Sequence, residues 1–261
     1  MKNYINELLK RKDLLIYLVK SGLKAEHRNS YLGYFWWLLD PLLNVAVYFF
    51  LVAIVLGRAG DDPREYLVYL AIGLISWRWI STTVNSSAKS ITKYSSIINQ
   101  VYLPKSIFPF AFTFSQLFNF GFGLIVIAIF LIFSGTIPGW QVVYLPFIIV
   151  AQLLFLIAIG LMLAYFNVFI RDIDYVLTHV TRVMFYASPI IWMGRLSGTS
   201  FSWIVDYNPV AILVNSYRDV LMYHSTPDLV ALMIIAVVSL MVSFGMLYHY
   251  SRNEHKIIKA L

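Results

Sequence analysis

Residues 142–169 read VVYLPFIIVAQLLFLIAIGLMLAYFNVF, and no charged side chain interrupts them. A helix crosses about 30 Å of hydrocarbon with roughly 20 residues, so this stretch is long enough to span a bilayer. Similar apolar stretches lie at about 34–56, 66–87, 108–134, 179–194 and 228–250. The stretch at 179–194 is short and contains Pro189, whereas the others are long enough to cross alone. The sequence therefore predicts an all-α membrane protein with six transmembrane helices.

The composition excludes several other classes of protein. Hydrophobic residues make up 60% of the 261 residues and charged residues 13%, against about 25% charged in a soluble domain. The chain has no cysteine, which excludes disulfides and thiolate chemistry. It has no phosphate-binding GxxxxGK[ST] motif, and its five histidines are scattered without metal-ligand spacing. We therefore expect no catalytic site, no metal and no cofactor on this chain.

The positive charges indicate an orientation. Fifteen of the 20 Lys and Arg residues fall in 1–33, 88–107, 170–182 and 251–261, and four fall in the connections on the other side. Because positive residues are retained on the cytoplasmic side, both termini are predicted to be cytoplasmic. The net charge of +7 then suits anionic lipid headgroups rather than nucleic acid. The predicted organisation is a cytoplasmic region 1–33, a membrane domain 34–250 and a basic tail 251–261.

Two segments beside the membrane have amphipathic patterns. Residues 2–24 place apolar side chains on one helical face, as in a helix that lies in the bilayer interface. This helix is either an anchor or a docking surface for a partner. Residues 89–101 form a second amphipathic pattern, which carries Lys89 and Lys93. That helix is either a gate for lipid entry or an ordinary connector.

Two connections between spans are distinctive. The turn at 170–178 contains Arg171, Asp172, Asp174 and Tyr175. A local ion pair there is the plainer interpretation, and a knuckle that seats in another subunit is the alternative. The largest external segment, 195–227, contains Asn208-Pro209, which predicts the start of a short helix too short to span the membrane.

Aromatic residues make up 17% of the chain. Trp77 and Trp79 flank Arg78 near several hydroxyl side chains, which is unlike a lipid-facing surface. Aromatic rings and hydroxyls suit a sugar, which presents C–H faces and hydroxyls of its own. Trp192 and Tyr207 either line an exit or belong to the aromatic belt at the membrane surface. Asp40 lies shallowly in the first span and is predicted to face protein or water.

Together these motifs resemble those of a known family, the membrane-spanning permeases of type-2 ABC exporters for lipid-linked polysaccharides of the O-antigen, capsule and teichoic-acid kind. The resemblance covers essentially the whole chain. Its motifs, in chain order, are Arg28-x-Ser30-x-Leu32-Gly33-x-x-Trp36-x-x-x-x-Pro41, Leu103-Pro104-Lys105, Arg171-Asp172-Ile173, Ser188-Pro189-Ile190 and Asn208-Pro209 followed by Arg218.

The resemblance implies a homodimer in the cytoplasmic membrane with two copies of a cytoplasmic ATP-binding subunit, which would hold the ATP and Mg. The cargo would be a glycan on a polyprenyl diphosphate. The turn with Arg171, Asp172, Asp174 and Tyr175 would contact the ATPase. The lipid diphosphate would enter at Lys89, Lys93 and Arg28, and segment 195–227 would form the external gate. The expected glycan-pathway residues are Trp36, Trp77, Arg78, Trp79, Trp192 and Tyr207.

Two other functions remain open from the sequence. Exporters of drugs or small lipids in the same superfamily share the six-span layout. A membrane-embedded enzyme that modifies lipids belongs to a different class and needs clustered acid, base or metal-binding residues. The isolated Asp and His residues of this chain do not supply such a cluster.

Overall fold

The computed structural model describes residues 2–26, 30–57, 60, 62–98, 103–193 and 203–261, and every regular element within these ranges is helical. Five helical stretches in them are long and apolar enough to cross a membrane. They are η1, α3 and η2 together (Gly33–Val55), α4 (Pro63–Ala88), α7 (Ile107–Ser134), η3 with α8 (Trp140–Phe169), and α12 (Leu229–Ala260). The predicted class of all-α membrane protein is confirmed.

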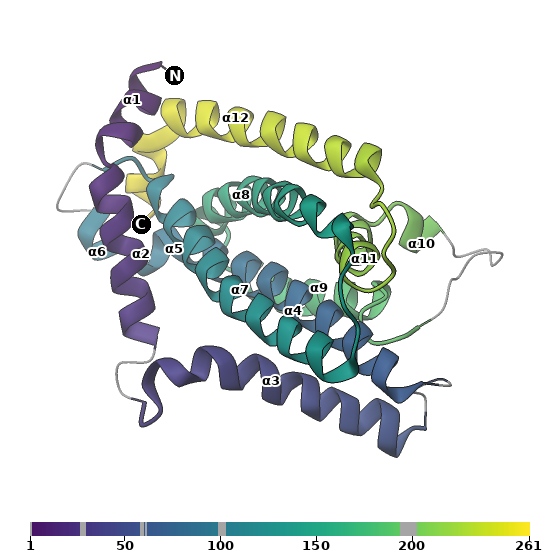
Figure 1. Ribbon diagram of the computed structural model, residues 1–261. Coiled ribbons are helices and arrows are strands. Elements are labelled where there is room, and N and C mark those ends of the chain that lie inside the picture. The colour runs from purple at the N-terminus through teal and green to yellow at the C-terminus, as the bar shows by residue number, and fades with distance from the viewer. Residues whose placement is uncertain (1, 27–29, 58–59, 61, 99–102, 194–202) are drawn as a thin grey trace.

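The predicted span at 179–194 corresponds to α9 (Ile173–Ala187), which has 15 residues. At 1.5 Å per residue it is about 22 Å long, which is less than the hydrocarbon thickness. The helix ends at Ser188, whose backbone is extended because the next residue is a proline. A count of six spanning helices is therefore not confirmed. Both termini nevertheless lie at the same end of the bundle (Figure 1), as an even number of traverses requires.

Helix α4 is the centre of the bundle. Of its most apolar window, 78% is buried, against 17% for the α3 stretch. Helices α7 and α8 pack against α4, and so do α3, α9 and α11 (Pro209–Leu221). Helix α3 lies along one edge of the body (Figure 1). Much of its apolar surface is thus available to lipid or to another protein.

The N-terminal segment packs on protein. It forms α1 (Lys2–Lys10) and α2 (Lys12–Glu26), and α2 lies against α7. Tyr4 and Leu18 are buried in a second core with Tyr250 and Ile257 of α12. The hydroxyls of Tyr4 and Ser106 are 3.0 Å apart and share a hydrogen bond. One layer therefore ties α1 and α2, the start of α7 and the end of α12 together.

The region predicted as one helix at 89–101 is divided. It contains α5 (Ser90–Lys93) and α6 (Ser95–Ile98), and residues 99–102 lie outside the described part. Tyr94 separates the two helices, and its ring stacks on Phe108 with centroids 5.1 Å apart. Burial raises the pKa of this tyrosine, which lies outside the spans, so it stays neutral.

The first span begins where the sequence predicts, near Tyr34. A 3₁₀ turn, η1 (Gly33–Phe35), leads directly into α3 (Trp36–Phe49), and Pro41 lies inside that helix. The helix continues as a π-helical segment, η2 (Phe50–Val55). At the other end of the bundle, Asn208 caps α11 by accepting a hydrogen bond from the Val210 N–H at 2.9 Å. The predicted cap is confirmed.

Candidate functional site

The two charged residues that the sequence places inside spans meet in the structure. Asp40 of α3 accepts a hydrogen bond from the Arg78 guanidinium of α4, and the two form an ion pair. Their side chains are 50% and 41% exposed. Exposed charges at this depth require water or protein beside them, because lipid would leave them unsolvated.

Beside this ion pair lies a depression of about 470 Å³ between α3, α4 and α9, which we call the polar groove. It is lined by Asn44, Tyr48, Leu74, Trp77, Arg78, Ser81, Thr82, Asn85, Thr178, Thr181, Arg182, Phe185 and Tyr186. Amide, hydroxyl and guanidinium groups are thus concentrated on one surface of an otherwise apolar bundle. Polar residues at membrane depth mark a solute pathway.

The polar face of α4 follows from helical spacing. Arg78, Ser81, Thr82 and Asn85 recur at intervals of three and four residues, which places them on one side of the helix. Thr82 donates its hydroxyl to the Arg78 carbonyl at 2.6 Å, and Asn85 donates its amide to the Ser81 carbonyl at 2.7 Å. Their oxygens remain as acceptors, which suit the hydroxyl donors of a sugar.

Aromatic rings form another part of the groove. The Phe185 ring lies 5.7 Å from Tyr48, 5.8 Å from Trp77 and 5.2 Å from Tyr186, measured between centroids. Tyr186 is 60% exposed. The groove thus combines exposed ring surface with hydrogen-bonding groups, the two features that a sugar requires.

The structure separates the residues expected on the glycan pathway. Trp77 and Arg78 line the polar groove, whereas Trp36 and Trp79 line a different cavity on the other side of α4. Trp192 donates its indole N–H to the Tyr186 carbonyl at 3.1 Å, which places it beside the groove. Tyr207 is 82% exposed, and nothing in the described residues links it to the groove.

A second depression, of about 540 Å³, lies on the side of the chain termini and is called the basal pocket here. It is lined by Lys89, Thr92, Ser95, Asn167, Arg171, Asp174, Tyr175, Thr178 and Leu261. The Lys89 ammonium is 3.8 Å from an Asp174 carboxylate oxygen. The structure therefore places Lys89, which was expected at the lipid entry, in contact with Asp174 of the turn that was expected to contact the ATPase.

The remaining entry residues do not join them. The Lys93 ammonium lies 5.3 Å from the centre of the Phe112 ring, outside the basal pocket. Arg28 lies outside the described residues. Asp172 is exposed and precedes α9, so it is available to a partner.

Sequence reasoning missed part of the groove. Asn44, Asn85, Thr178, Thr181 and Arg182 line it without having been singled out. The signal for Asn85 is present in the spacing from Arg78. The threonines of α9 repeat three residues apart, and Arg182 follows one helical turn after Thr178.

Arg218 belongs to the motifs that carry the resemblance, but the sequence assigns it no role beyond lying near the end of α11. Its side chain is almost fully buried, and its guanidinium carbon lies 3.4 Å from the centre of the Tyr69 ring. It donates hydrogen bonds to the carbonyls of Tyr69, Pro189 and Ile190. Arg218 thereby fastens the non-helical stretch after α9 to α4.

The fold is that of a multi-pass membrane protein, and the polar groove fits a transport function. A family model for the ABC-2 type transporter matches residues 14–222. Two similar proteins are named O-antigen export system permease protein RfbA. The one from Myxococcus xanthus is 30% identical over 241 residues, which is 92% of each chain. One from Klebsiella pneumoniae is 30% identical over 211 residues, which is 80% of each chain.

The chain therefore belongs to the ABC-2 type transporter family. It is a permease subunit and not an enzyme, because ATP hydrolysis in this family is carried out by a separate subunit. The resemblance derived from the sequence motifs is confirmed at this level.

Proposed function

We propose that this chain is the permease of an ATP-driven exporter that moves an O-antigen-type polysaccharide, carried on a polyprenyl diphosphate, across the cytoplasmic membrane. The observation that carries the proposal is the polar groove, whose exposed Tyr186 ring and acceptor oxygens fit a sugar chain. The names of the similar proteins favour O-antigen over teichoic acid as the cargo class.

The functional unit in this proposal is a homodimer with two ATP-binding subunits, which bind the ATP and Mg. In one chain the groove is open, and the α3 stretch beside it is poorly buried. A second copy would close the groove into a channel and cover apolar surface of α3. Closure matters because a hydrated glycan cannot pass against lipid.

The basal pocket supports a route for the lipid diphosphate. Lys89 and Arg171 supply two cations, and Ser95 supplies a hydroxyl donor. Lys89 is also paired with Asp174 at 3.8 Å, a distance at which a phosphate could compete for the ammonium. Binding of the diphosphate would thus break the ion pair between Lys89 and Asp174, and would change the contacts of the turn that is proposed to bind the ATPase. Both termini are cytoplasmic in this orientation.

Replacing Tyr186 by alanine tests the proposed pathway. The side chain is exposed in the groove, so its removal should leave the fold intact. Loss of one ring contact, worth about 1 kcal/mol, should slow export about fivefold. The measurement is the amount of polyprenyl-diphosphate glycan in the cytoplasmic leaflet, which should rise accordingly.

Tyr248→Ala is the matched control, since Tyr248 is 43% exposed on α12, away from the groove. Its export should be unchanged. If complete loss of the protein caused no lipid-linked glycan to accumulate, the polysaccharide assignment would be wrong. An exporter of drugs or small lipids would then be favoured.

Charge reversal at the coupling turn tests the proposed ATPase contact. Arg171→Glu is expected to reduce co-purification of the ATP-binding subunit by about tenfold, because the turn is charged and exposed. The permease itself should stay folded, since Arg171 is on the surface. Arg64→Glu, an exposed change on the α4 end remote from this turn, is the control. Undiminished co-purification and ATPase stimulation would contradict the proposed contact.

A further inference from the structure

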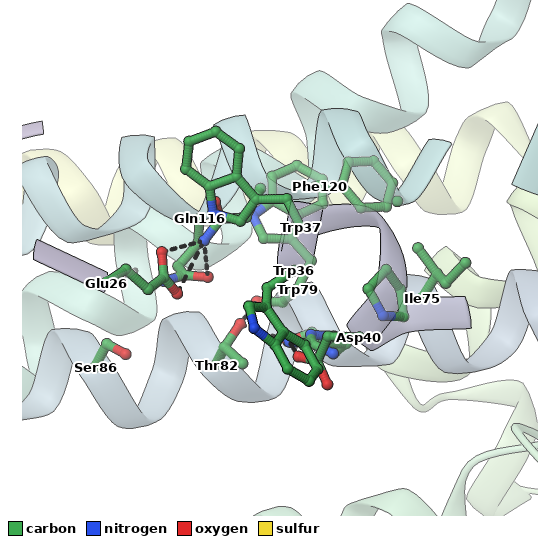
Figure 2. Close-up of a pocket in the computed structure, with 14 residues that line it drawn as sticks. Glu26, Trp36, Trp37, Asp40, Ile75, Trp79, Thr82, Ser86, Gln116 and Phe120 are labelled. Carbon is green, nitrogen blue, oxygen red and sulfur yellow. Dashed lines mark hydrogen bonds and ion pairs between the residues drawn. The ribbon is translucent and has the colours of Figure 1, made fainter. Parts of the chain in front are cut away.

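The cavity that contains Trp36 and Trp79 is separate from the polar groove. It has a volume of about 190 Å³ and lies where the end of α2 meets α3, α4 and α7. Three tryptophans, Trp36, Trp37 and Trp79, contribute to its lining, and we call it the tryptophan cavity (Figure 2). Arg78 lines both this cavity and the groove, so the Asp40–Arg78 pair forms part of the wall between them.

The described charges of the tryptophan cavity sum to one negative. Asp40 is neutralised by Arg78, which leaves the carboxylate of Glu26. Glu26 accepts hydrogen bonds from the Asn119 amide at 3.2 and 3.4 Å (Figure 2), and no lysine or arginine of the described residues pairs with it. Glu26 is exposed, so this carboxylate lies at an opening of the cavity. Among the described residues, the cavity thus has a carboxylate that can accept a cation.

The Trp36 indole complements that carboxylate, because the rings of Trp37 and Trp79 already pack on Phe122 and Phe120, with centroids 4.9 and 4.4 Å apart. Tryptophan is the ring that best attracts an organic ammonium group over its face. Trp79 also offers a hydrogen-bond donor. The residue is 2% exposed, and its indole N–H has no hydrogen-bond partner among the described residues. A buried N–H without a partner is costly, so a ligand oxygen at this position would be stabilising.

The depth of the cavity matches the headgroup region of one leaflet. Trp36 opens α3, and Thr82 and Ser86 of α4 lie within about two helical turns of Ala88, where α4 ends. These ends lie on the side of the bundle that holds the chain termini. Headgroups of that leaflet therefore lie level with the opening at Glu26.

We propose that the tryptophan cavity binds a zwitterionic aminoethyl-phosphate group, supplied by an aminophospholipid of the surrounding leaflet. The ammonium group pairs with Glu26 and faces the Trp36 indole, which also lines the cavity. The phosphate accepts hydrogen bonds from the Trp79 indole and from guanidinium N–H groups of Arg78 that Asp40 does not use. Such a lipid would hold α3 against α4 and α7. This site is independent of the exported cargo.

The experiment uses the purified full-length protein in mild detergent, mixed with equal amounts of phosphatidylethanolamine and phosphatidylglycerol. Retained lipids are counted by native mass spectrometry. Phosphatidylethanolamine is expected to be retained about tenfold more than phosphatidylglycerol, since only the former carries an ammonium group. Glu26→Gln should abolish this preference, and Trp79→Phe should weaken retention while filling most of the same space.

Glu65→Gln is the matched control, because Glu65 is an exposed carboxylate of α4 outside the cavity. It should keep the preference. Equal retention of the two lipids by the unaltered protein, or an unchanged preference in Glu26→Gln, would overturn the proposal. A third arm adds soluble phosphoethanolamine. Displacement of the lipid at equal concentration would assign the site to the free molecule instead of the lipid.

Discussion

Replacing Lys105 by methionine is expected to lower the free energy of unfolding by about 3–5 kcal/mol, because it removes a buried cation that pairs with a buried carboxylate. The Lys105 side chain is fully buried, and its ammonium is 3.3 Å from an oxygen of Glu254. The backbone N–H of Lys105 donates to the same oxygen at 3.1 Å. This contact joins the start of α7 to the end of α12, 149 residues later.

Thermal unfolding in detergent measures the effect. Lys256→Met is the control, since Lys256 is exposed on the same helix, and its change should stay within about 0.5 kcal/mol. The double replacement Lys105→Met with Glu254→Gln should recover much of the loss, because the neutral amide carries no charge and its oxygen can still accept from the backbone N–H of residue 105. A single Lys105→Met variant as stable as the control would show that the pair contributes nothing.

The second large effect is expected from Arg218→Leu. The substitution removes the guanidinium donors from the carbonyls of Tyr69, Pro189 and Ile190. Pro189 keeps the Tyr69 hydroxyl as a donor at 3.2 Å, whereas a buried carbonyl left unpaired costs about 1–3 kcal/mol. The stretch after α9 should detach from α4. We expect a destabilisation of about 3 kcal/mol or more, and local opening should precede global unfolding.

A single cysteine introduced as Ser188→Cys reports this opening in a chain that has no other cysteine. Ser188 is fully buried, so the thiol should resist labelling in the parent and react readily when Arg218→Leu is added. Arg64→Leu is the comparison, since Arg64 is exposed near the same end of α4. Equal protection of the thiol in all three proteins would exclude the proposed fastening.

Gly73 allows the Arg218 side chain to lie close against α4. A side-chain carbon at Gly73 would collide with the Arg218 guanidinium and would lie 2.8 Å from the Ile190 carbonyl oxygen. The absence of a side chain there allows α4, the stretch after α9 and α11 to approach one another.

The parts of the fold that sequence could predict are those fixed by local chemistry. The uninterrupted apolar run of α8 and the Asn208 cap need no distant partner, and both are confirmed. The environment of Arg218 depends on Tyr69, 149 residues away, so a single sequence gives no signal for it. The stretch 179–194 was placed six to seven residues too late, because hydropathy continues past Ser188 while the helix does not.

The candidate site was predictable to a similar extent. Trp77 and Arg78 were recognised as unsuited to lipid, and they line the polar groove. Trp79 was grouped with them by its position in the sequence. Two residues apart on a helix means about 200° of rotation, so Trp79 faces the opposite side. It lines the tryptophan cavity and stacks on Phe120, with ring centroids 4.4 Å apart.

The contrast in burial between α4 and the α3 stretch has a mechanical consequence. A helix buried on most sides transmits force, whereas a helix held by few contacts is displaced at little cost. The body built on α4 is thus the stiff part of the subunit, and α3 is its compliant wall. If the passage widened for a bulky cargo, α3 would move first, and the helices packed around α4 would keep their positions.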